Sequence, residues 1–242
     1  LEDKKKGFGV LNRRILPYEP FIPVIAALLH EIDSNFTHIQ HDCLEKLKNW
    51  YWTSVFDSRY SGAVDSTKTA DFISMVNWFG DDSKIPTDIK NFRQTYSLSL
   101  HLENITSSSS SIYRGILCLL RKNDADDYEK AIVIEQKSPH IDHIFPKSKF
   151  KMDDKEKSIL NLSWLTSETN TKIKRDKNPS LYISQTIMKK YNGNEEKFLE
   201  ILKSHFVDRK CLECLKNDDF EGFIQQRRKV IIGEIAKQIG AS

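Results

Sequence analysis

The sequence predicts an α+β fold that is mostly α-helical, with one small β-β-α unit embedded between helical regions. Apolar residues recur at helical spacing over most of the 242 residues, as expected for helices that bury one face. Between residues 130 and 180 this spacing gives way to two short runs of β-branched and aromatic residues, followed by a helix start. We therefore expect a helical domain at 1–129, the β-β-α unit at 130–180, and C-terminal helices at 181–242 that pack on both.

The first region contains strong helical patterns in three stretches: "YEPFIPVIAALLHEI", "QHDCLEKLKNWYWTSVF" and "TADFISMVNWF". Thr69, at the start of the third stretch, resembles a helix cap. The segment before it, "DSRYSGAVDST", is rich in Ser, Gly and Asp and is predicted to be a loop. A serine run predicts another helix start near Ser111, with Asn123 close to its end.

The middle region is predicted to run strand, loop, strand and helix. Strand candidates are "AIVIEQ" at 131–136, "HIDHIFP" at 140–146 and "LNLSWL" at 160–165. A short helix follows in "TSETNTKIKRD", with Thr166 or Ser167 as its N-cap, and the Asn-Pro pair at 178–179 ends it. Further helices are predicted in three stretches: "SLYISQTIMKKY", "EEKFLEILKSHF" and "DFEGFIQQRRKVIIGEIAKQI".

Composition limits the class of protein. The net charge is +3, with 39% hydrophobic and 29% charged residues, which is ordinary for a folded globular chain. No apolar run reaches the roughly 20 residues that span a bilayer, so we expect no membrane partner. Four cysteines in a chain of this size do not resemble a disulfide framework, so we expect a reducing, cytoplasmic location. The chain starts without Met or a signal peptide, and we expect a fragment of a longer protein.

The stretch "HIDHIFPKSKF" places candidate chemistry at the end of a predicted strand. Asp142 offers an oxygen ligand for a hard divalent cation. His143 has a reference pKa of about 6.5, so it is mostly neutral at cellular pH and can take a proton from water. Asn170, early in the predicted helix, offers a second oxygen ligand, and Asn161 is placed to orient His143. Together these residues suit a metal-dependent phosphodiesterase.

Basic residues gather on both sides of this set. We expect four of them to contact backbone phosphates, which adds affinity without sequence specificity: Lys147, Lys172, Lys174 and Arg175. For these cations a merely solvated face is the alternative. His140 either lines the site or has a plain structural role.

The residues carry a resemblance to a known family. The runs "IDHIFPKS" and "NLSWLTSETN", with a basic helix that ends at a proline, resemble an HNH endonuclease of the ββα-metal class. The form is similar to the C-terminal HNH domain of GmrSD-type restriction enzymes and SspE-like phage-defence proteins. The resemblance implies His143 as general base, Asp142 and Asn170 as metal ligands, and Asn161 as the middle asparagine of HNH. Family members often have His where this chain has Asp142.

The resemblance also implies an activity and a setting. The activity is hydrolysis of DNA phosphodiester bonds, by nicking or cleavage, with Mg²⁺ or Mn²⁺ as cofactor. The setting is a modification-dependent restriction or phage-defence protein with an N-terminal nucleotide-hydrolysing domain, whose DGQR motif this sequence lacks. Two alternatives stay open: an inactive HNH fold that binds DNA or regulates, and a structural zinc protein built on Cys211 and Cys214.

Overall fold

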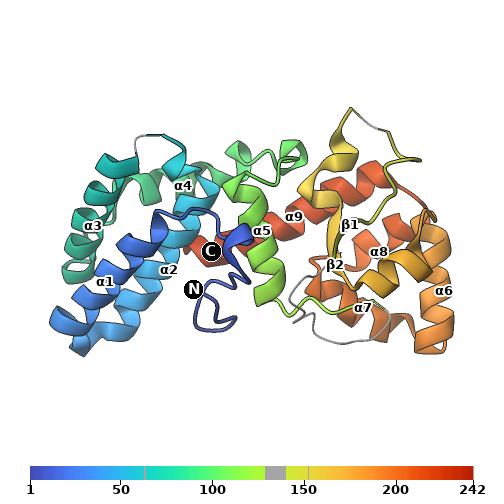
Figure 1. Ribbon diagram of the computed structural model, residues 1–242, viewed down its shortest axis with the longest axis horizontal. Coiled ribbons are helices and arrows are strands. Elements are labelled where there is room, and N and C mark those ends of the chain that lie inside the picture. Colours follow the sequence, from blue (N-terminus) through green and yellow to red (C-terminus); the bar gives the residue numbers. More distant parts are fainter. Residues whose placement is uncertain (63, 129–139, 152, 242) are drawn as a thin grey trace. The chain divides into compact units, whose positions relative to one another are not determined.

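The computed structural model describes residues 1–62, 64–128, 140–151 and 153–241. Its elements confirm a mostly helical α+β fold that contains a two-stranded antiparallel sheet (Figure 1). The strand predicted at 131–136 lies outside the described residues. In the described part of the chain, no helix combines the length and the apolar character needed to cross a membrane.

Two compact units make up the chain, and each combines segments that are distant in sequence. We call the first the motif unit; it comprises Leu1–Arg13, His101–Ser108 and Ile116–Ile232. We call the second the helical unit; it comprises Arg14–Leu100, Ser109–Gly115 and Gly233–Ser242. The three-region division expected from the sequence stays a prediction.

The helical unit contains helices α1 (Phe21–Asn35), α2 (Gln40–Phe56), α3 (Val64–Gly80) and α4 (Thr87–Ser99). Helices α1, α2 and α3 pack against one another, and α4 packs against α2. Aromatic residues fill this core: the ring centroid of Phe21 lies 4.9 Å from that of Tyr51 and 5.6 Å from that of Trp50. All three side chains are buried, so the aromatic residues of α2 stabilise the core of this unit.

The loop predicted at 57–67 is too long. Helix α3 begins at Val64, so Thr69 lies inside the helix and does not cap it. Asp65 and Ser66, which helped to suggest a loop, belong to the first turn of the helix, where Asp65 interacts favourably with the helix dipole. Helix α4, which lies between α3 and the serine run, is a further helix that the sequence did not predict.

The motif unit and its boundaries contain helices α5 (Ser111–Lys122), α6 (Pro179–Tyr191), α7 (Glu195–Ser204), α8 (Arg209–Lys216) and α9 (Phe220–Ile239). Helices α5 and α9 contribute residues to both units. The predicted start of α5 at Ser111 is confirmed, and so are α6, α7 and α9. Helix α8 carries Cys211 and Cys214, which agrees with the helical character expected for the C-terminal region, although its bounds were not predicted. Short 3₁₀ turns lie at Arg13–Ile15, Thr37–Ile39, Arg59–Ser61, Leu102–Asn104, Lys155–Lys157 and Ile159–Asn161.

The sheet pairs β1 (His140–His143) with β2 (Leu162–Leu165). The two strands are antiparallel, with Asp142 opposite Ser163 and His143 opposite Leu162. All four residues of β2 are buried, whereas β1 begins at the surface and becomes half-buried toward His143. The C-terminal end of β1, where Asp142 and His143 lie, is therefore more buried than its N-terminal end.

The segment after β2 differs in kind from the expected short α-helix. It contains a π-helix at Thr169–Lys174, which has a wider turn than an α-helix. Thr166 has the capping role predicted for it, since its hydroxyl accepts the backbone N–H of Thr169 at 3.2 Å. Buried Asp127 holds the same turn, because it accepts from the hydroxyl of Thr169 and from the backbone N–H of Thr166. A single turn of π-helix often occurs at a functional site.

Candidate functional site

The candidate site lies at the C-terminal end of β1. Neighbouring residues of a regular strand point to opposite faces, so an adjacent Asp and His would not normally meet. Here the strand stops at His143, and its Nδ1 lies 4.0 Å from Oδ1 of Asp142. The following amide, that of Ile144, donates to the carbonyl oxygen of Asn161 at 2.7 Å. The end of the strand thus brings both side chains to one place.

His143 is held as a neutral base. Its side chain is 21% exposed, and burial lowers its pKa to about 4, with a further lowering by the positive charges of Lys147 and Lys174. Asp142 and Glu156 act in the opposite direction but do not overcome burial. At neutral pH the imidazole is therefore unprotonated, which is the state that a general base requires.

Asn161 supports the site through the backbone. The side chain is fully buried, and its Oδ1 accepts the N–H of Phe145 at 2.8 Å. Its Nδ2 donates to the carbonyl oxygens of Phe145, at 3.0 Å, and of Glu156, at 2.8 Å. The sequence predicts that Asn161 orients His143. Two of the side-chain hydrogen bonds of Asn161 go to the backbone of Phe145, in the loop that follows His143. Any effect of Asn161 on the orientation of His143 therefore acts through the backbone between them.

Lys174 is buried beside Asp142, although a lysine is usually exposed to solvent. It ends the π-helix, and its ammonium forms an ion pair with Oδ2 of Asp142. The Lys174 side chain is only 3% exposed, and burial lowers its pKa while Asp142 opposes that change. Instead of standing in solvent, where it would contact a phosphate, it neutralises the carboxylate that the sequence assigns to a metal.

The remaining predicted residues lie on β1, on the loop after it, and in or just after the π-helix. Asn170 is half-buried in the π-helix, where its backbone carbonyl oxygen accepts the backbone N–H of Arg175 at 2.9 Å. Arg175 and His140 are exposed, and Arg175 has a positive φ of 46°. Lys147 is exposed on the loop after β1. The side chain of Lys172 lies outside the described part of the structure.

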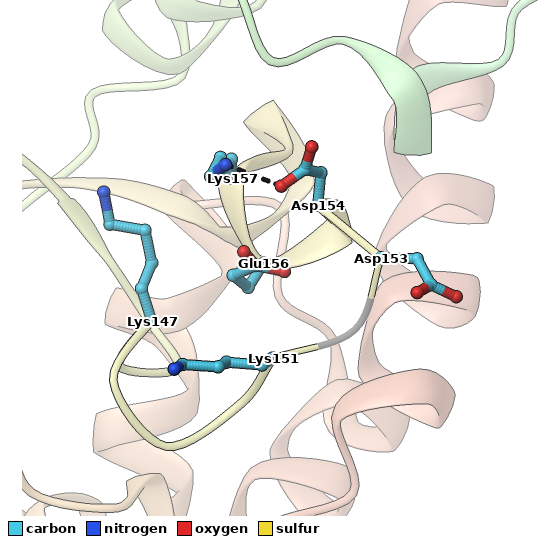
Figure 2. Close-up of a pocket in the computed structure, with 6 residues that line it drawn as sticks. All are labelled: Lys147, Lys151, Asp153, Asp154, Glu156 and Lys157. Carbon is cyan, nitrogen blue, oxygen red and sulfur yellow. Dashed lines mark hydrogen bonds and ion pairs between the residues drawn. The ribbon is translucent and has the colours of Figure 1, made fainter.

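A hollow of about 560 Å³ lies in the loop region between β1 and β2 and is lined by Lys147, Lys151, Asp153, Asp154, Glu156 and Lys157 (Figure 2). Lys157 pairs with Asp154 at 2.6 Å, while Asp153 points away from the two lysines of the loop (Figure 2). Two of its lining residues, Lys147 and Glu156, also act on the pKa of His143: the lysine lowers it and the glutamate raises it. The lining therefore carries three basic and three acidic side chains.

Sequence reasoning missed a buried polar network under β2. The hydroxyl of Tyr128 donates to Oγ of Ser163 at 2.9 Å, and that Oγ lies 2.7 Å from Nδ1 of His205. The other ring nitrogen of His205 lies 2.5 Å from the carbonyl oxygen of Asp126. Burial lowers the pKa of His205 to about 4, so the neutral ring accepts from Ser163 and donates to the carbonyl.

Arg227 was also missed, and it fixes the backbone around Asn161. It is fully buried in α9, and its guanidinium donates to the carbonyl oxygens of Leu160 and Leu162, each at 2.7 Å. A third bond runs to the carbonyl oxygen of His205 at 2.8 Å. The apolar and amphipathic spacing of α9 gave no signal for this role, because the partners are backbone atoms of other segments.

The chemistry of the site suits a hard divalent cation. Asp142 supplies a carboxylate oxygen, and the ammonium of Lys174 already shows that a positive charge is favourable there. Within the described ranges, no group of three or more His, Cys, Asp or Glu gathers at one point. The protein ligands would thus be few, namely Asp142 and the carboxamide of Asn170, with water at the other positions, as Mg²⁺ commonly has.

The fold and the site together define a mostly helical α+β protein with an Asp-His pair at the end of a two-stranded sheet. The chain is 32% identical to a protein of Methanocaldococcus jannaschii that is described as uncharacterized. That alignment, over 256 positions, covers 96% of this chain and 43% of the relative, so the chain spans less than half the relative's length. No family model matches the chain, and no solved structure matches it.

Proposed function

We propose that this chain is a metal-dependent HNH endonuclease that hydrolyses phosphodiester bonds of DNA. The observation that carries the proposal is the meeting of Asp142 and His143, 4.0 Å apart, where β1 ends. The order strand, loop, strand and helical turn, with Asn170 in the turn, supports the ββα-metal class. The neutral state of His143, and the lysines Lys147 and Lys151 of the loop that follows β1, agree with a hydrolase that acts on an anionic backbone.

In this mechanism His143 accepts a proton from a water molecule, which attacks phosphorus as the bond to the leaving 3′ oxygen breaks. Asn161 holds the loop that follows His143, so that the imidazole keeps its place during the reaction. Lys147 and its neighbours in the hollow bind the phosphate backbone without reading its sequence. Mg²⁺ or Mn²⁺, bound by Asp142 and Asn170, would supply positive charge that stabilises the charge developing on the phosphate.

The biological setting is a proposal that rests on the sequence resemblance alone. It comprises a cytoplasmic restriction or phage-defence protein whose nucleotide-hydrolysing domain precedes the nuclease. The longer relative from M. jannaschii has room for further domains, which is compatible with such an arrangement in that protein.

A plasmid assay tests the activity. The intact chain should convert supercoiled plasmid to nicked or linear DNA in Mg²⁺ or Mn²⁺. His143→Ala should slow this conversion by roughly 10²- to 10⁴-fold, the usual contribution of a general base. His41→Ala, an exposed histidine of the helical unit, is the matched control and should cut normally. Equal nicking by His143→Ala and the intact chain would remove His143 from the mechanism.

A second candidate function is a DNA-binding or regulatory module that no longer cuts. The ion pair between Lys174 and Asp142 favours it, because the carboxylate that a metal needs is already neutralised. A shift of DNA mobility by the intact chain, with no cutting in either metal, would select this candidate over the nuclease.

A further inference from the structure

The contact between Lys174 and Asp142 differs from an ordinary surface ion pair. Only 3% of the Lys174 side chain and 23% of the Asp142 side chain are exposed. A charge this deeply buried needs a partner, because the protein interior solvates an isolated ion poorly. The ammonium of Lys174 is therefore the positive charge that balances Asp142.

The position of Lys174 in the chain is equally informative. It is the last residue of the six-residue π-helix that also contains Asn170, the second residue assigned to the metal. The π-helix thus contributes a cation to Asp142, and the residue to which the sequence assigns the second metal-ligand oxygen lies in the same helix. A divalent cation at Asp142 would compete with the ammonium for the same carboxylate, since both need its oxygen atoms.

We propose that Lys174 is the resident cation of Asp142, which a divalent metal ion must displace before it can bind. This inference rests on the proposed function and adds a regulation of its metal site. While the ion pair is closed, Asp142 is neutralised and the metal affinity is low. When the metal binds, the ammonium leaves the carboxylate and becomes available to a substrate phosphate, which is the role that the sequence predicts for Lys174.

Binding of Mn²⁺ to the full chain, measured by isothermal titration calorimetry without DNA, tests this inference. Lys174→Met keeps the length and apolar stem of the side chain but removes its charge. It should bind Mn²⁺ at least about tenfold more tightly than the unchanged chain, a change easily resolved as affinity. Asp142→Asn should lose the binding. Lys177→Met is the control, because Lys177 bonds to Gln185 and should leave the affinity unchanged.

The outcomes separate this inference from the proposed function. Equal or weaker Mn²⁺ binding by Lys174→Met would overturn the inference, and the nuclease would stand if plasmid nicking still depends on His143. Tighter binding by Lys174→Met that Asp142→Asn abolishes supports the inference, whether or not DNA is cut. Binding that survives Asp142→Asn, or no binding in any variant, would overturn both the metal site and the displacement.

A measurement on the unchanged chain covers the case in which Lys174→Met does not fold. Lysine acetylation by a water-soluble reagent, read by mass spectrometry, reports whether each ammonium is accessible. Lys174 should react slowly without metal and faster when Mn²⁺ is bound. Lys203, which is 54% exposed, should react at the same rate in both conditions. Bound Mn²⁺ that leaves the reactivity of Lys174 unchanged would contradict the displacement.

Discussion

At the scale of single residues, His143 and Asn161 act in different ways. The imidazole is kept neutral mainly by burial and then by the charges of Lys147 and Lys174. The carboxamide of Asn161 does not need to touch the imidazole, because it fixes the peptide of Phe145, two residues further along. Buried amides with both ends satisfied in this way rigidify their surroundings. In the proposed nuclease, Asn161 would therefore position the loop after His143 without contacting the imidazole.

The charge of Lys147 provides a residue-scale prediction. Lys147→Ala removes a positive charge that disfavours protonation, so the pKa of His143 should rise from about 4. It should stay below the reference value of about 6.5, because burial is the larger cause. Two-dimensional NMR of the imidazole nitrogens during a pH titration measures the pKa of His143. Lys189 is an exposed lysine of α6, and Lys189→Ala should leave the pKa of His143 unchanged. An unchanged His143 titration in Lys147→Ala would contradict the assigned influence.

At the scale of elements, the local patterns predicted most of the helices and both described strands. The pattern at 40–56 matches α2 at both ends, since its apolar face and its boundaries lie within one stretch of sequence. The start of α3 was missed because Ser and Asp suit both a loop and the first turn of a helix. The π-helix was predicted as an ordinary helix, since the caps and charges that define a helix start are the same for both.

The packing of α5 against α2 gives a prediction at this scale. A Cβ at Gly115 would lie 2.5 Å from Cγ1 of Val55, so Gly115→Ala must push the helices apart. We expect the free energy of unfolding to fall by about 1–3 kcal/mol, measured by urea denaturation. Gly233→Ala in α9 is the matched control, because nothing lies within 4 Å of its added Cβ. There alanine should be neutral or stabilising by up to about 1 kcal/mol. Equal effects at both positions would argue against close packing at Gly115.

At the scale of the whole molecule, buried neutral histidines link stability to pH. His205 is fully buried, and its pKa is about 4 in the folded protein against about 6.5 when unfolded. Between these values the unfolded chain binds a proton that the folded chain does not. Stability from this group is thus complete above pH 6.5 and is lost as the pH falls toward 4.

This linkage predicts the behaviour of His205→Gln in acid. The free energy of unfolding of the unchanged chain should fall by about 2 kcal/mol between pH 7 and pH 5 through His205, on the reference scale. His205→Gln does not titrate, so it should be less stable at pH 7 but lose less on acidification. Urea denaturation at the two pH values measures both losses. Identical losses in the two proteins would show that His205 does not carry the effect.

The fold class, both described strands and the meeting of Asp142 with His143 at a strand end followed from the sequence, because periodicity, caps and neighbouring residues are local properties. The partners of Lys174, Asn161, His205 and Arg227 did not. Lys174 and Asp142 are 32 positions apart, and Arg227 and Leu160 are 67 positions apart. Contacts of this kind depend on the path of the chain and on which side chains it buries. Residue type alone does not predict that a particular lysine or arginine will be buried. Only the tertiary structure shows that Lys174, which the sequence predicts to bind phosphate, is the counter-ion of Asp142, the predicted metal ligand.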